Sequence, residues 1–310
     1  MKDKKVIITG GLGFIGSNIA KQLVKDNDVL IIDNEATGYL KNIRNIKTRN
    51  LKITHGDILE LDLVKIFKGY DYLLHHAAIP SVPRSIEDPI GTNDAGITGT
   101  IKVLKAASDA GIKKVVFASS SSVYGNTPAL PKKEDMPLNP LSPYAVTKAT
   151  GELYCKVFQE IYGLPTIALR YFNVFGPRQD LNSQYAAVIP KFINSMLKDE
   201  SPIVYGDGEQ SRDFTHVKHV IEANVLACES NTTGVFNIAC GERITINQLI
   251  GMINEILNKN IMAKYCRQRP GDVKHSLADI SKARSFGYDP KSDFKKELKE
   301  TIKWFEKCPN

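Results

Sequence analysis

The chain has 310 residues, of which 42% are hydrophobic and 24% charged, and its formal net charge at pH 7 is +7. This length suits one large or two ordinary domains of a globular protein, and no apolar run approaches the ~20 residues that a membrane-spanning helix needs. The basic residues form no recognisable nucleic-acid module, and the N-terminal apolar run is too short for a signal peptide. We therefore expect a cytoplasmic protein that binds neither nucleic acid nor membrane.

Strand-like and helix-like segments alternate through the first half of the chain. Short β-branched runs predict strands at 6–8, 29–32, 51–54, 72–74, 115–117 and 166–169. Apolar residues at helical spacing predict helices between them, including 15–23, 97–104 and 144–162. This alternation is typical of a Rossmann-like, doubly wound parallel sheet with helices on both faces, in the α/β class.

The second half has a more irregular pattern. It contains a helix-like segment at 187–197, a strand-like run at 235–238 that we expect to rejoin the first sheet, and an amphipathic tail helix at 294–305. We predict a cofactor-binding Rossmann domain over 1–174, with a return near 217–240. A smaller mixed α/β lobe over 175–310 is expected to bind the substrate and to be interleaved with the first domain.

The segment TGGLGFIG, residues 9–16, directly follows the first predicted strand. Its glycines at 10, 13 and 16 allow a tight turn, a close approach of backbone N–H groups to a pyrophosphate, and close helix packing. Asp33 ends the second predicted strand, at a position where an acid accepts hydrogen bonds from the ribose hydroxyls of the dinucleotide. Together, Asp33 and Glu35 would repel a 2′-phosphate. The pattern predicts NAD rather than NADP; the alternative is a glycine turn beside a solvated aspartate.

Histidines and cysteines give no metal-binding pattern. His75 and His76 end the fourth predicted strand, and we interpret them as strand-end residues beside the cofactor. The number of cysteines is odd and their spacing matches no zinc site, so we predict free thiols and no metal. These cysteines are Cys155, Cys228, Cys240, Cys266 and Cys308.

Tyr144 and Lys148 are four residues apart at the start of the longest predicted helix, and therefore share a face. One interpretation is a partly buried tyrosine beside a surface lysine. The other is catalytic: the ammonium and a nicotinamide cation lower the pKa of the tyrosine from about 10 toward neutrality, so that it removes a hydroxyl proton.

The segments TGGLGFIG, HHAA, SSSSVYG, SPYAVTK and RYFNVFGPR together resemble the extended short-chain dehydrogenase/reductase superfamily, and within it the nucleotide-sugar 4-epimerases. The resemblance covers nearly the whole chain. It implies bound NAD, a UDP-sugar substrate and a homodimer formed through helices near 95–110 and 144–162. The cofactor contacts that it implies are Gly10, Gly13, Phe14, Ile15, Gly16, Asp33, Asn34, Asp57, Ile58, Ala77, Ala78, Tyr144 and Lys148.

The resemblance also implies catalytic roles. Tyr144 would take the proton of the sugar 4-hydroxyl as C4 gives its hydride to NAD, Lys148 would hold the cofactor ribose and tune Tyr144, and Ser121 would hydrogen-bond the 4-oxygen. The 4-keto sugar would then turn and take the hydride back on its other face. Related dehydratases and decarboxylases carry acids where this chain has Ser121-Ser122. The serines therefore favour epimerisation over elimination or decarboxylation.

The implied substrate contacts include a gate residue, Ser276, whose small side chain leaves room for an N-acetyl group. Arginines at 212 and 269 suit the diphosphate because a guanidinium binds phosphate oxygens bidentately. Gly96 and Pro80 depart from the pattern of many relatives. The full set of expected contacts is Ser81, Ser121, Ser122, Asn173, Gln179, Ala187, Val188, Tyr205, Arg212, Arg269, Asp272 and Ser276.

The leading interpretation is an isomerase, a UDP-sugar 4-epimerase that prefers UDP-N-acetylglucosamine and UDP-N-acetylgalactosamine and also accepts UDP-glucose and UDP-galactose. One alternative is a UDP-glucuronate 4-epimerase, for which Arg178 is the candidate partner of the C6 carboxylate. Another is a protein that senses dinucleotide without catalysis, although such a protein would not need Ser121, Tyr144 and Lys148 together.

Overall fold

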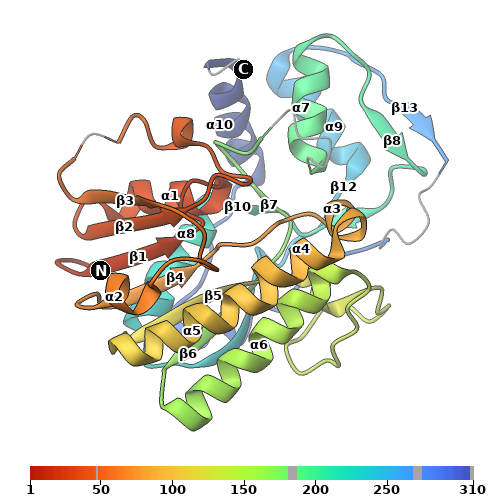
Figure 1. Cartoon of the computed structure of the whole chain (residues 1–310). Coiled ribbons are helices and arrows are strands. Elements are labelled where there is room, and N and C mark those ends of the chain that lie inside the picture. The colour runs from red at the N-terminus through yellow and green to blue at the C-terminus, as the bar shows by residue number, and fades with distance from the viewer. Residues whose placement is uncertain (47, 181–186, 268–273, 308–310) are drawn as a thin grey trace.

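The computed structural model describes residues 1–46, 48–180, 187–267 and 274–307. Within these residues seven strands form one parallel sheet, in the order β11-β6-β5-β4-β1-β2-β3 (Figure 1). Its strands are β1 (Lys5–Thr9), β2 (Asp28–Asp33), β3 (Leu51–His55), β4 (Tyr72–His75), β5 (Lys114–Ser120), β6 (Thr166–Tyr171) and β11 (Gly234–Ile238). The predicted fold class is confirmed, and β11 rejoins the sheet beside β6, while the division into two domains stays a prediction.

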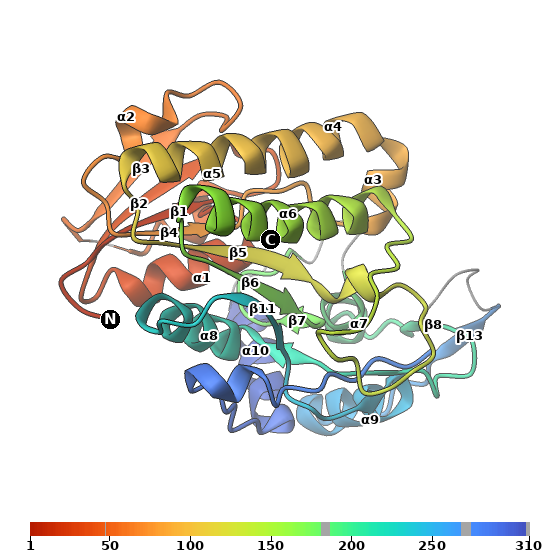
Figure 2. The same cartoon turned by 90° about the horizontal axis from the view of Figure 1, so that it is seen from below.

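Helices cover both faces of this sheet, as Figure 2 shows. One face carries α2, α5 and α6 over a buried apolar cluster, and the other carries α1 and α8 over a second cluster. The helices of the described residues are α1 (Phe14–Leu23), α2 (Leu63–Phe67), α3 (Val82–Glu87), α4 (Pro89–Asn93), α5 (Gly99–Ala110), α6 (Pro143–Tyr162), α7 (Val188–Leu197), α8 (Val217–Glu229), α9 (Ile246–Leu257) and α10 (Phe294–Lys307). None of them combines the length and apolar character needed to cross a membrane.

The longest helix, α6, has clear start and stop signals. The Ser142 hydroxyl accepts a hydrogen bond from Ala145 N at 3.1 Å, and Pro143 occupies the first helical position. The helix ends at Gly163, whose φ of 65° is easily adopted by glycine. The start signals fix the first turns of α6 and with them the positions of Tyr144 and Lys148.

Gly96, one of the departures noted in the sequence, lies in a π-helical turn (Asp94–Thr98) that precedes α5. A Cβ atom on Gly96 would lie 2.7 Å from the Cβ of Thr147 on α6, so no larger side chain fits there. The Gly96 carbonyl also accepts a hydrogen bond from the Thr100 hydroxyl at 2.6 Å. Glycine at this position therefore allows the close approach of this turn to α6.

The C-terminal half adds a smaller lobe with its own apolar cluster, to which α7, α9 and α10 contribute. Its short strands pair as β7 with β10, β8 with β13, and β9 with β12. They are β7 (Val174–Phe175), β8 (Ile203–Tyr205), β9 (Ser211–Arg212), β10 (Thr215–His216), β12 (Ile244–Thr245) and β13 (Lys264–Cys266). Between these strands in sequence lie α8 and β11, yet β11 pairs with β6 in the large sheet and α8 packs beside α1.

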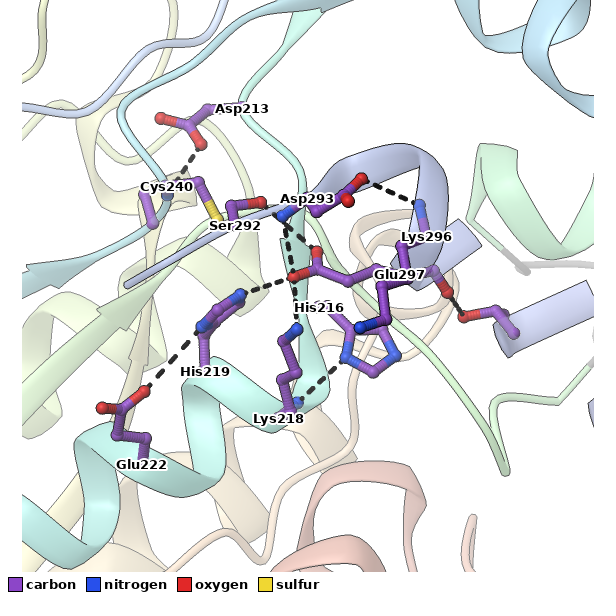
Figure 3. Close-up of polar contacts among 12 residues, drawn as sticks. Asp213, His216, Lys218, His219, Glu222, Cys240, Ser292, Asp293, Lys296 and Glu297 are labelled. Atoms are coloured by element: carbon purple, nitrogen blue, oxygen red, sulfur yellow. Dashed lines mark hydrogen bonds and ion pairs between the residues drawn. The ribbon is translucent and has the colours of Figure 1, made fainter. Parts of the chain in front are cut away.

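The tail helix α10 is fastened to the N-terminal turn of α8 by a buried carboxylate (Figure 3). Glu297 accepts hydrogen bonds from His219 Nε2 and Lys218 Nζ, both at 2.8 Å. It also accepts from the Ser292 hydroxyl at 3.3 Å and from Asp293 N at 3.4 Å. The amphipathic tail predicted from its apolar face is thus held by a polar contact as well.

Candidate active site

A cavity of about 670 Å³ opens at the carboxyl ends of β1, β2, β4 and β5. This is the edge at which doubly wound sheets bind their ligands. All the expected cofactor residues line it: Gly10, Gly13, Phe14, Ile15, Gly16, Asp33, Asn34, Asp57, Ile58, Ala77, Ala78, Tyr144 and Lys148. The structure therefore brings together residues from five separate parts of the sequence.

The glycines leave no room for side chains. A Cβ atom on Gly10 would lie 2.7 Å from Ala77 N, and one on Gly16 would lie 2.3 Å from Gly10 O. The helix that follows, α1, begins after Gly13 with no side-chain cap, so its first backbone N–H groups remain available for an anion. This cradle fits a pyrophosphate.

Two carboxylates line the neighbouring part of the cavity. Asp33 accepts hydrogen bonds from Leu12 N at 2.9 Å and from Glu35 N at 2.8 Å, which fixes its position at the end of β2. Asp57 accepts from Asn34 Nδ2 at 2.8 Å. A carboxylate has lone pairs to spare beyond these bonds, so Asp33 fits the hydroxyls of an adenosine ribose.

The two strand-end histidines have different surroundings. His75 is buried between the hydroxyls of Thr9 and Thr100, at 2.7 and 3.0 Å. His76 lines the cavity, and its Nε2 lies 3.0 Å from the hydroxyl of Tyr171. Burial lowers the pKa of both histidines to about 3, so both are neutral at physiological pH.

Tyr144 and Lys148 lie side by side in the cavity wall. Lys148 Nζ lies 5.7 Å from the centroid of the Tyr144 ring and donates to Ala118 O at 2.8 Å. Burial lowers the pKa of Lys148 to about 8. Burial also raises the pKa of Tyr144, against the lowering expected for a catalytic base. The difference arises because the nicotinamide charge invoked for that lowering is not part of the protein itself.

The serine run divides into distinct contacts. The side chain of Ser120 opposes the rise that burial gives the Tyr144 pKa. Ser120 also accepts from Ser122 N at 3.1 Å, as β5 ends and a 3₁₀ turn (Ser121–Tyr124) begins. Ser120 therefore acts on the protonation of Tyr144 from the end of β5. The predicted role of Ser121 at the sugar oxygen stays a prediction.

Three of the expected substrate residues line the same cavity: Ser81, Gln179 and Ala187. Ser81 caps α3 with a φ of 97°, an uncommon conformation for a residue other than glycine. Gln179 donates to Val174 O at 3.3 Å, and its Oε1 is buried without a hydrogen-bond partner. Pro80 and Arg84 also line this end of the cavity, and the sequence had given no role to Arg84.

Other expected substrate residues that the structure describes do not line this cavity. Asn173 donates to Asp213 O at 2.9 Å and to the hydroxyl of Ser276 at 3.4 Å, so these segments meet. Arg212 lies on β9 and Tyr205 at the end of β8. Val188 is the first residue of α7, Ser122 lies in the 3₁₀ turn, and Arg269 and Asp272 fall outside the described residues.

Asp213, next to Arg212, ties three of these segments together. Its fully buried carboxylate accepts from the backbone N–H groups of Cys240, Gly241 and Ala278, at 3.0, 3.1 and 3.1 Å. Figure 3 shows the bond from Cys240. Burial raises the pKa of Asp213 to about 7, and the three N–H groups oppose that rise. The aspartate therefore fixes the loop after β11 against the segment that carries Ser276.

Comparison with known proteins places this architecture in one family. Residues 6–239 match the NAD dependent epimerase/dehydratase family. A solved UDP-N-acetylglucosamine 4-epimerase from Methanobrevibacter ruminantium, in complex with UDP-N-acetylmuramic acid, is 52% identical, with a TM-score of 0.97 and 99% of each chain covered. A UDP-glucuronic acid 4-epimerase from Bacillus cereus, in complex with UDP-glucuronic acid and NAD, is 32% identical, with a TM-score of 0.91 and coverage of 98% of this chain and 99% of that chain.

Among curated proteins, a UDP-glucose 4-epimerase from Mycolicibacterium smegmatis is 32% identical over 308 residues, which cover 97% of this chain and 98% of the relative. The relatives thus differ in the sugar that their names specify but agree in fold and length. The matched region contains the glycine cradle, Asp33, Tyr144 and Lys148, where the geometry fits a dinucleotide. The chain belongs to the NAD dependent epimerase/dehydratase family, and its cofactor is NAD.

Proposed function

We propose that this protein is a UDP-sugar 4-epimerase that prefers UDP-N-acetylglucosamine and UDP-N-acetylgalactosamine and also converts UDP-glucose and UDP-galactose. The observation that carries the proposal is the position of Tyr144 and Lys148 in the wall of the cavity that holds the glycine cradle. A proton acceptor and a cation thereby face the place where a dinucleotide and a sugar would meet. A protein that only senses dinucleotide has no need of this pair.

Bound NAD supplies a hydride acceptor and donor. The protein handles the proton: the Tyr144 hydroxyl takes it from the sugar 4-hydroxyl and later returns it to the 4-oxygen. Since burial raises the pKa of Tyr144, its deprotonation needs positive charge and hydrogen bonds nearby. The ammonium of Lys148, fixed by Ala118 O, and the hydroxyl of Ser120 are placed to supply them.

The preference for acetamido sugars rests on the residues around Asn173. Ser276 is small and hydrogen-bonded to Asn173, which supports space for a 2-acetamido group. Arg178, the candidate for binding a C6 carboxylate, donates to Ser17 O at 3.3 Å and to Asn18 Oδ1 at 3.2 Å. These bonds direct it toward α1 and support the acetamido sugars over UDP-glucuronate. The 52% identical UDP-N-acetylglucosamine 4-epimerase supports the same choice.

The test is incubation of the purified protein with each UDP-sugar, without added NAD, followed by separation of the C4 epimers. We expect conversion of UDP-N-acetylglucosamine, and loss of conversion in Tyr144→Phe by at least about 100-fold, because proton transfer contributes factors of that order. Retained NAD in the purified variant is the control for folding. No conversion of any UDP-sugar would refute the epimerase proposal, and conversion of UDP-glucuronate alone would refute the acetamido preference.

A matched pair of variants separates the two serines. Because the Ser120 side chain opposes the rise in the Tyr144 pKa, we propose that Ser120 assists the proton transfer and that Ser121 contacts the sugar. Ser120→Ala should lower kcat by about 10-fold or more, in line with the loss of one hydrogen bond of ~1.4 kcal/mol in the transition state. Ser121→Ala should raise KM more than it lowers kcat, if Ser121 contacts the sugar. A kcat loss confined to Ser121→Ala would reverse this assignment.

We also propose that the protein is a homodimer formed through α6. The outer face of α6 exposes Val146, Leu153, Val157 and Ile161, with exposed fractions of 57% for Leu153 and 71% for Ile161. A contiguous apolar stripe of this kind on a soluble helix is typical of an interface. Light scattering after gel filtration should give twice the chain mass, and Ile161→Lys should give a monomer; a monomeric wild type would refute the proposal.

A further inference from the structure

Two successive residues of β5 contact two residues of α6 that lie one helical turn apart. Ala118 O accepts from Lys148 Nζ, and the Ser119 hydroxyl donates to Glu152 Oε1. Because Tyr144, Lys148 and Glu152 are spaced by four residues, they share one face of the helix. The two contacts therefore fix α6 against β5 on the face that carries Tyr144.

Of these α6 side chains, Glu152 makes the most hydrogen bonds to the sheet. Arg170 donates to it bidentately, from Nε to Oε1 at 2.8 Å and from Nη2 to Oε2 at 2.7 Å. Arg170 lies on β6 opposite Ser119 in the sheet register, so adjacent strands grip the same carboxylate. Both members of the ion pair are nearly inaccessible to solvent, with exposed fractions of 4% for Glu152 and 3% for Arg170.

The guanidinium is itself fixed from other directions. Its Cζ lies 4.7 Å from the centroid of the Tyr124 ring, and its Nη1 donates to Glu134 O at 3.4 Å. Tyr124 in turn donates to Asn237 Oδ1 on β11 at 2.7 Å. An Arg–carboxylate pair with this planar, bidentate geometry restricts movement far more than a single contact does. Glu152 is therefore anchored to the sheet rather than to solvent.

We propose that Glu152, held by Arg170 and Ser119, is a positioning residue that fixes Tyr144 and Lys148 in the cavity and balances the buried charge of Lys148. Glu152 does not line the cavity, so it acts through the helix and through its charge rather than by touching a ligand. The kinetic consequence of this inference rests on the proposed epimerase function, and the structural consequence does not.

The charges around Lys148 come from two elements. On α6 itself, Glu152 and the thiol of Cys155 oppose the lowering of the Lys148 pKa, while Tyr144 is neutral because burial raises its pKa. On β4, His75 and His76 are uncharged at physiological pH because burial lowers the pKa of both to about 3. Loss of the Glu152 charge would remove a negative charge that favours the protonated amine of Lys148.

The test measures the titration of Lys148 directly, by ¹³C NMR of lysine Cε with Lys148→Arg as the assignment control. In Glu152→Gln, we expect the midpoint to move to lower pH by about one unit. Glu152→Gln/Arg170→Met lacks the same carboxylate, so its midpoint should be lowered as far as in Glu152→Gln. Glu160→Gln, which removes an exposed acid paired with Lys156 on the same helix, should leave it unchanged.

Epimerisation rates give the second readout. Glu152→Gln should lower kcat by about 10–100-fold with little change in KM, because small misplacements of catalytic groups cost factors of this order. The double variant should also keep a lowered kcat, since it lacks both the charge and the contacts of Glu152. Ser119→Ala, which leaves the ion pair intact, should lower kcat less and provides a milder variant if Glu152→Gln does not fold.

An unmoved Lys148 midpoint in Glu152→Gln, or a kcat equal to that of Glu160→Gln, would overturn the inference. A wild-type protein that converts no UDP-sugar would refute the proposed function instead. In that case the NMR midpoints would still decide whether Glu152 balances the charge of Lys148.

Discussion

Two buried glutamates hold helices in place in the two halves of the molecule, but their surroundings differ. Glu152 in α6 forms an ion pair with Arg170, and both side chains are almost completely inaccessible to solvent. Glu297 in α10 is fully buried, yet the side chain of its cationic partner Lys218 is 43% exposed to solvent (Figure 3). A buried ion pair stabilises only if both charges stay matched, whereas a solvated partner can be lost at small cost. The first pair should therefore be far more sensitive to the loss of its cation.

The largest expected effect follows from removing the cation of the buried pair, Arg170. Arg170→Met leaves the Glu152 charge buried without its partner, and we expect the free energy of unfolding to fall by about 3–5 kcal/mol. Urea denaturation, with the midpoint and slope both fitted, measures this change. The double variant Glu152→Gln/Arg170→Met should recover most of the loss. A loss as large in the double variant would mean that side-chain packing, rather than unmatched charge, dominates at this site.

Neither glutamate could be assigned from the sequence, for a physical reason. A glutamate one turn beyond Lys148, or within the lysine-rich tail, has the pattern of an exposed helix face. Their burial depends on partners 18 residues away for Glu152 and 78 residues away for Glu297. Only the folded arrangement brings those cations into contact, so local spacing carries no signal of it.

The cofactor region, in contrast, was predictable because its signals are local. The glycines at 10, 13 and 16 lie in one short segment directly after β1, and the cavity brings them next to Asp33 as expected. The serine run marks the limit of this reasoning. Which hydroxyl reaches Tyr144 depends on where β5 ends and the 3₁₀ turn begins, and this geometry favours Ser120.

A smaller effect, with a distinct pH dependence, is expected for the second glutamate. Its cationic partners lower the pKa of Glu297 to about 2 from the ordinary value of 4.5, despite burial. A depressed folded-state pKa means that the stabilisation is complete above about pH 4.5 and is lost as the pH falls toward 2. Glu297→Gln should therefore lower the free energy of unfolding by about 1–3 kcal/mol at pH 7.

Urea denaturation at pH 7, 5, 4 and 3 tests this dependence. The difference between wild type and Glu297→Gln should shrink steadily below about pH 4.5, because the Glu297 carboxylate is then protonated in the unfolded chain but still ionised in the folded protein. A difference that stays constant down to pH 3 would show that the carboxylate charge makes no contribution and that only shape and hydrogen bonding matter there.

The smallest expected effect follows from removing Lys218, the partly exposed cation that pairs with Glu297. This variant compares the two glutamates most directly. Lys218→Met takes away one donor to Glu297 but leaves His219 Nε2 bonded at 2.8 Å, and the lost ammonium was partly solvated. We expect the free energy of unfolding to change by less than about 1 kcal/mol, as for exposed ion pairs. Lys299→Met, an exposed position on α10, is the matched control for loss of a surface charge. A loss of unfolding free energy in Lys218→Met close to that in Arg170→Met would mean that solvent exposure of the cation does not govern the strength of these pairs. Any contrast between the two glutamates would then arise from their hydrogen-bond geometry.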